Sequence, residues 1–275
     1  MRIDMKNRKI IITFSICFLK TAGLLAQSLP ADASIYKQYT NTTVLSGVKG
    51  EYYFKKNSCV YYSADYNFNQ NYRYRVTNGT RLYNRLGLEM NVGGRWYLGG
   101  SISHRLAYDT HLNMATIKGN LTHRGKIGSV QFIKELSAEY IHHFNTTFFD
   151  KNSDIQAGIG AALYKDFKVF KRPLGFLLSY KILLNSNLQF DIYKNRSIDF
   201  TKLRIDVFYG ITKNIYLGLY AMRETEYFYP PGTSDAFGNN IYYKQNNIYP
   251  IVGATLSIVL HPENIERYIP GLPFR

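Results

Sequence analysis

Serine, histidine and acidic side chains are the residues of this chain that could carry out catalysis, but their spacing argues against it. A lipase or deacylase built on a β-barrel places a serine and a histidine in contact on its outer wall, with a polar group that orients the histidine. Ser101, Ser103 and His104 are the nearest candidates. Ser103 and His104 are neighbours in a predicted strand, so their side chains point to opposite faces. We therefore predict that the chain is not an enzyme, and a barrel enzyme acting on lipid stays open as the weakest alternative.

Two further groups of side chains could carry acid–base or metal chemistry. Glu135 and Glu139 share one face of a predicted strand, but about 13 Å separates them, which is too far for paired-carboxylate chemistry. His142 and His143 are adjacent, and the remaining histidines show no metal-ligand spacing with carboxylates or thiols. The sequence thus predicts no catalytic residue, no cofactor and no metal site.

The clearest structural pattern is a pair of alternating segments around a tight turn at residues 93–95. Apolar side chains alternate with polar or charged ones over residues 82–92, and the alternation resumes over residues 96–108. A period of two indicates strands with one apolar and one polar face. The second strand runs for about a dozen residues, which is long for a soluble hairpin and sufficient for a tilted strand to cross a bilayer.

The overall composition agrees with a wall built in this way. The 275 residues are 45 % hydrophobic and 19 % charged, with 25 Tyr, 17 Phe and one Trp. The mean hydropathy of −0.25 is nevertheless polar, as it is in barrels whose apolar and polar residues alternate. Beyond the N-terminus no stretch approaches 18 consecutive apolar residues, so we predict no transmembrane helix.

The same alternation continues along the chain, most clearly in residues 59–68, 130–140, 155–163, 174–184, 203–209, 215–222 and 248–260. We count eleven clear strands. An even number closes a single-chain bacterial barrel, so we expect a weak first strand between about residues 34 and 43. The predicted fold is an all-β, closed antiparallel transmembrane β-barrel over residues 27–260. The expected number of strands is about 12, within a range of 10 to 14.

The N-terminus has the three regions of a secretory signal peptide. Four basic residues precede an apolar run at 10–19, and Gly23-Leu24-Leu25-Ala26 leads to a predicted cleavage after Ala26. Residues 1–26 hold five of the 34 Lys and Arg and one of the 19 Asp and Glu, which leaves the mature chain at +11. Cys59 is then the remaining cysteine, which excludes an internal disulfide. We expect the exported chain to reach the outer membrane of a Gram-negative cell.

Connections between the predicted strands alternate in length. The shorter ones are at 55–58, 93–95, 124–126, 165–173 and 210–214, and the generally longer ones are at 70–79, 110–113, 145–154, 185–197 and 229–240. Outer-membrane barrels have short periplasmic turns and longer extracellular loops. We assign the two sets accordingly, which places residues 261–275 on the periplasmic side as a C-terminal tail.

If the apolar face meets lipid, the polar face lines the lumen, and its charges balance. This predicted lumen charge network consists of Asp65, Arg81, Arg85, Glu89, Arg105, Glu135, Glu139, Lys181, Lys202, Arg204, Asp206 and Glu224. Six basic and six acidic residues favour charges paired across a filled lumen over a filter for ions of one sign. A small solute channel stays open as the alternative.

Excess positive charge is expected on the shorter turns. We call this set the basic rim: Lys55, Lys56, Arg95, Arg124, Lys126, Lys168, Lys171, Arg172 and Lys213. Anionic lipid head groups and an acidic periplasmic protein are both candidate partners. The basic residues are spread over separate turns and do not lie among stacking aromatics in one groove, so we expect no direct nucleic-acid binding.

Several short motifs occur in an order that resembles one family. They are Gln27-Ser28-Leu29-Pro30, Tyr52-Tyr53-Phe54, Ser63-Ala64-Asp65-Tyr66, Tyr72-Arg73-Tyr74-Arg75, Leu98-Gly99-Gly100-Ser101, Leu106-Ala107-Tyr108-Asp109-Thr110 with Asn113, and Met222-Arg223-Glu224. Their order is similar to that of the TraO family of conjugative-transposon transfer proteins. The resemblance implies a non-catalytic outer-membrane component of a DNA-transfer apparatus. The chain departs from the family in its longer loops at 185–197 and 229–247 and in its C-terminal tail.

Overall fold

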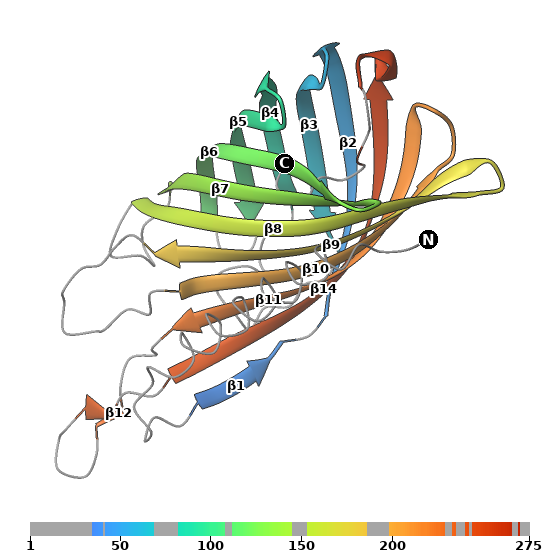
Figure 1. Ribbon diagram of the computed structural model, residues 1–275. Helices are drawn as coiled ribbons and strands as arrows, with labels where there is room; N and C mark the ends of the chain where they lie inside the picture. Colours follow the sequence, from blue (N-terminus) through green and yellow to red (C-terminus); the bar gives the residue numbers. More distant parts are fainter. Residues whose placement is uncertain are drawn as a thin grey trace, which may run out of the picture.

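The protein is a closed β-barrel (Figure 1). The computed structural model describes residues 35–40, 42–68, 82–107, 112–144, 153–185, 198–228, 233–234, 240–241, 244–265 and 269. The predicted signal peptide therefore lies outside the described residues.

The wall strands are β2 (Thr43–Lys55), β3 (Ser58–Asn67), β4 (Leu82–Gly93), β5 (Trp96–Ala107), β6 (Leu112–Ile127), β7 (Val130–His143), β8 (Ser153–Val169), β9 (Arg172–Asn185), β10 (Ile198–Gly210), β11 (Ile215–Phe228) and β14 (Lys244–Leu260). Each pairs with its neighbours in chain order, and β14 closes the ring against β2. A separate short pair is formed by β12 (Thr233–Ser234) and β13 (Asn240–Ile241). Among the described residues no helix is long and apolar enough to span a membrane.

The predicted closed barrel of about twelve strands is confirmed, with a difference in how it closes. Within the described chain eleven strands form the wall, and β1 (Ile35–Tyr39), in the segment where a weak first strand is expected, lies outside it. An odd number of alternating strands leaves the first and last pointing the same way. The closing pair is therefore parallel, with Thr43 opposite Ile251 and Tyr52 opposite Leu260. β1 pairs with the start of β14, also in parallel, so it continues the line of β2.

Alternation along each strand separates an apolar outer face from a polar interior. On β4, Leu86, Leu88 and Met90 are 38–55 % exposed, whereas Glu89 between them is 3 % exposed. The same division holds on β14, where Leu256 and Ile258 are exposed and Ser257 is buried. Side chains of a strand point alternately to its two faces, so this pattern places apolar residues on the outside of the whole wall. We call the enclosed space the lumen.

Glycines on the inward face receive large side chains from adjacent strands. A Cβ on Gly87 would lie 2.3 Å from the ring of Tyr61, and a Cβ on Gly253 would lie 2.3 Å from the ring of Tyr220. Both tyrosines therefore lie flat along the wall of the lumen, across the next strand. This arrangement buries aromatic rings in a lumen that also carries charges.

The connections at one end are tight turns. Two of them differ from the prediction in length or position. Strand β8 continues to Val169 and β9 begins at Arg172, so the expected turn at 165–173 is two residues long. Strand β6 continues to Ile127, which places residues 124–126 in a strand. We call the end that carries these turns the short-turn end. The connections at the other end fall mainly outside the described residues.

Candidate functional site

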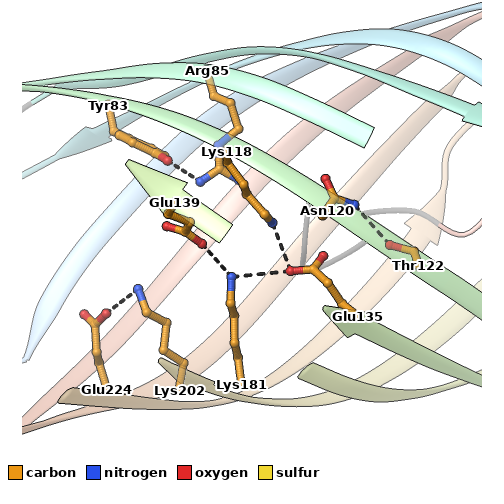
Figure 2. Close-up of polar contacts among 10 residues, drawn as sticks. All are labelled: Tyr83, Arg85, Lys118, Asn120, Thr122, Glu135, Glu139, Lys181, Lys202 and Glu224. Atoms are coloured by element: carbon orange, nitrogen blue, oxygen red, sulfur yellow. Dashed lines mark hydrogen bonds and ion pairs between the residues drawn. The ribbon is translucent and has the colours of Figure 1, made fainter. Parts of the chain in front are cut away.

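The lumen holds the densest cluster of charged side chains in the described part of the chain. Lys181 on β9 lies 2.7 Å from the Glu139 carboxylate and 3.4 Å from the Glu135 carboxylate, both on β7. Glu135 also lies 3.0 Å from the ammonium group of Lys118 on β6. Figure 2 shows this chain of ion pairs running along the inner wall. Lys181 reaches β7 across β8, where the inward residue Gly158 leaves room for its side chain.

A second ion pair joins two neighbouring strands of the wall. Lys202 on β10 lies 2.5 Å from the Glu224 carboxylate on β11 (Figure 2). Glu224 also interacts electrostatically with Arg105, which lies on β5 at the opposite side of the ring. Lys202 likewise interacts with Glu139 on β7. The close contact of this group is therefore the one between the neighbouring strands β10 and β11.

A third group lies on the strands around the parallel closure. Arg204 forms a two-pronged contact with Asp206, with a closest distance of 2.6 Å, and its guanidinium carbon is 3.8 Å from the ring centroid of Tyr220. Asp65 on β3 interacts electrostatically with the same arginine. Lys49 and Glu51 form a buried ion pair at 2.7 Å on β2. These contacts place charge of both signs next to the closing strands.

The structure describes eleven of the twelve residues of the predicted lumen charge network. Arg81 lies outside the described residues, and the other eleven lie on inward faces of their strands. Sequence reasoning missed Lys49, Glu51 and Lys118. All three share the inward parity of their strands, so extending the alternation through β2 and β6 identifies them.

The basic rim is largely exposed at the short-turn end, with one exception. Lys55, Lys56, Arg95, Lys126, Lys168, Lys171, Arg172 and Lys213 are exposed. Arg124 instead projects into the lumen, where it pairs with Glu89, and its guanidinium carbon lies 3.7 Å from the ring centroid of Tyr97. The reason is that strand β6 extends past residue 124, so the inward parity of the strand applies to it.

The described residues of the C-terminal segment, 261–265 and 269, lie at the mouth of the barrel at the short-turn end. His261 adopts a left-handed conformation after β14, and a short 3₁₀ helix, Pro262–Asn264, follows. The Asn264 side chain donates a hydrogen bond of 2.9 Å to the Tyr53 carbonyl, and the Asn264 carbonyl accepts one of 2.9 Å from the Asn57 amide. These bonds fix the start of the segment to the β2–β3 turn.

Two isoleucines then contact opposite sides of this mouth. Ile265 packs against a buried cluster from β2, β3 and β14, formed by Tyr53, Cys59, Tyr61 and Val259. Ile269 is 3 % exposed and packs with Ile133, Ala162, Tyr164, Leu177 and Phe208 from β7, β8, β9 and β10. These two residues of the segment therefore contact different sides of the mouth. The first carboxylate of the tail, Glu263, is exposed, and its own backbone amide and then the His261 side chain lower its pKa.

Catalytic and metal candidates are not brought together. Ser101 and Ser103 are buried on the inward face of β5, whereas His104 is exposed on the outer face. His143 lies 3.4 Å from Asp154. In the described residues no group of three or more His, Cys, Asp or Glu side chains is arranged to hold a metal ion.

The fold and the lumen define this chain as a closed β-barrel with a charge-paired interior. Compared with known proteins, the chain matches no protein-family model and shows no significant sequence similarity to a curated protein.

Proposed function

We propose that the chain is a non-catalytic outer-membrane β-barrel that serves as a structural component of a conjugative DNA-transfer apparatus. Its belt of exposed apolar side chains supports a place in lipid, because closed barrels are the β form that leaves no backbone group unpaired there. In this proposal the short turns face the periplasm and the longer connections face the exterior. The role in DNA transfer rests on the resemblance to the TraO family.

The observation that carries the structural role is the set of ion-paired side chains that line the lumen, among them Lys118–Glu135, Lys181–Glu139 and Lys202–Glu224. A channel requires a continuous path of water, whereas these side chains occupy the inner face of the wall on β6, β7, β9, β10 and β11. Ile265 and Ile269 pack on two different sides of the short-turn mouth, which is a second obstruction. Both features favour a structural barrel, which contacts other molecules at its rims, over a small solute channel.

Single-channel recording in a planar bilayer tests this proposal. The refolded full chain is expected to show no steady current, while heat-modifiable migration on a gel shows that the barrel has formed. A steady open current from the folded chain would overturn the structural role in favour of the channel.

In donor cells, deletion of the gene is expected to lower the frequency of conjugative transfer, and unchanged transfer would reject the conjugation role alone.

A further inference from the structure

The basic rim surrounds the barrel. Its exposed cations occupy the turns that join β2 to β3, β4 to β5, β6 to β7, β8 to β9 and β10 to β11, so they occur at intervals around the ring. In the described residues of these turns and their immediate flanks, Asp166 is the one acidic side chain, against eight exposed basic ones. Glu263, which follows β14 at the same end, is also exposed and interacts electrostatically with Lys213. Basic side chains therefore outnumber acidic ones at this end of the barrel.

Each of four turns pairs a cation with an exposed apolar side chain beside it in sequence. Lys55 follows Phe54, which is 46 % exposed, and Arg95 precedes Trp96, which is 48 % exposed. The same juxtaposition occurs at Lys126–Ile127 and at Phe170–Lys171. Aromatic side chains next to cations are typical of the level at which lipid tails meet head groups. The rim thus lies directly at the edge of the apolar belt.

The β8–β9 hairpin extends this arrangement furthest (Figure 1). Residues 165–169 of β8 pair with β9 but have no partner in β7, whose ladder with β8 ends at Tyr164. On its outer face the rings of Phe167 and Phe176 meet edge to face at 5.9 Å, and the Lys165 ammonium lies 5.7 Å from the Phe167 centroid. Phe170 at the tip is 91 % exposed. An apolar surface and cations therefore occur together on one projecting element.

We propose that the basic rim binds the phosphate head groups of anionic phospholipids. This inference rests on the proposed location in a membrane. The cations are distributed around the ring, and in four turns a cation adjoins an exposed apolar side chain, which favours lipid over an acidic protein bound at one side. Lys and Arg attract the negative surface of a membrane by an amount that corresponds to about fivefold in affinity for each residue near it.

Trp96 supplies the measurement, because it is the one tryptophan of the chain and lies next to Arg95. The full chain is refolded into phosphatidylcholine vesicles that contain brominated phosphatidylglycerol or brominated phosphatidylcholine, and quenching of Trp96 fluorescence gives the relative affinity of each lipid. We expect phosphatidylglycerol to be preferred by about fivefold at low salt, with a smaller preference at high salt because ions screen the attraction.

Two variants make the test specific. Arg95→Gln is expected to reduce the ratio of the affinity for phosphatidylglycerol to that for phosphatidylcholine towards one. Lys126→Gln replaces this variant if Arg95→Gln does not fold. Lys37→Gln makes the same charge change at the far end of β14, where β1 pairs, and is expected to leave the preference unchanged. Equal quenching by both lipids would overturn the head-group proposal while leaving the membrane barrel intact. Absence of quenching by either lipid in a folded chain would instead reject the membrane location, and the head-group proposal with it.

Discussion

The Glu135 carboxylate lies 3.0 Å from the Lys118 ammonium group, and both side chains are almost completely buried inside the barrel. The same carboxylate lies 3.4 Å from Lys181, which also contacts Glu139 at 2.7 Å. Glu135 thus lies within 3.4 Å of two lysine ammonium groups, whereas the short contact of Glu139 is with Lys181.

Glu135→Gln is therefore expected to lower the free energy of unfolding by about 3–5 kcal/mol, because it removes the carboxylate that lies 3.0 Å from the buried Lys118 ammonium group. Equilibrium unfolding in urea, followed by heat-modifiable migration, measures the change. Glu139→Gln is the matched control and should cost less, since Lys181 keeps Glu135. Equal losses in the two variants would show that Glu135 has no special position.

Replacing an inward glycine should disturb the tyrosine that lies over it. Gly87→Ala places a methyl group about where the ring of Tyr61 lies, so we expect a loss of about 1–3 kcal/mol in the free energy of unfolding. Gly50→Ala, where a Cβ would meet no atom within 4 Å, should change that quantity by less than about 0.5 kcal/mol. Similar unfolding curves for both variants would contradict the packing described for the lumen.

The β8–β9 turn is conformationally strained. Phe170 and Lys171 have φ angles of 48° and 64°, a region that bulky residues rarely adopt and that two-residue hairpins usually fill with Asn-Gly. The double substitution Phe170→Asn and Lys171→Gly is expected to raise the free energy of unfolding by about 1 kcal/mol. The same urea assay measures the gain. A loss of stability would contradict the assignment of strain to this turn.

The C-terminal segment should control access to Cys59. This thiol is completely buried in the cluster on which Ile265 packs. In a Cys17→Ser background, Asn264→Ala removes the bond to the Tyr53 carbonyl, which costs about 1 kcal/mol, and should speed labelling of the thiol by a charged reagent several-fold. Thr212→Ala is the control, because it removes bonds to the Asn214 and Ile215 amides in a turn at the same end. Equal labelling rates in both variants would show that the segment does not cover the thiol.

The faces of the strands could be predicted from sequence because the side-chain period of a strand is local. Alternation over residues 82–92 and 96–108 is sufficient to place Arg85 and Glu89 inside and Leu86 and Leu88 outside, whatever the rest of the chain does. The predicted lumen charges follow from the same rule. Where the rule was not extended, as at Lys49 and Lys118, the residues were missed although the signal was present.

Other features depended on which distant strands meet. The odd number of wall strands and the parallel pairing of β2 with β14 join segments that lie at opposite ends of the chain. The contacts of Ile265 and Ile269 with two sides of the mouth likewise require the closed ring. Alternation determines only the direction in which a side chain points. Its partner is decided by the register and closure of the barrel, which arise from hydrogen bonds between strands far apart in sequence.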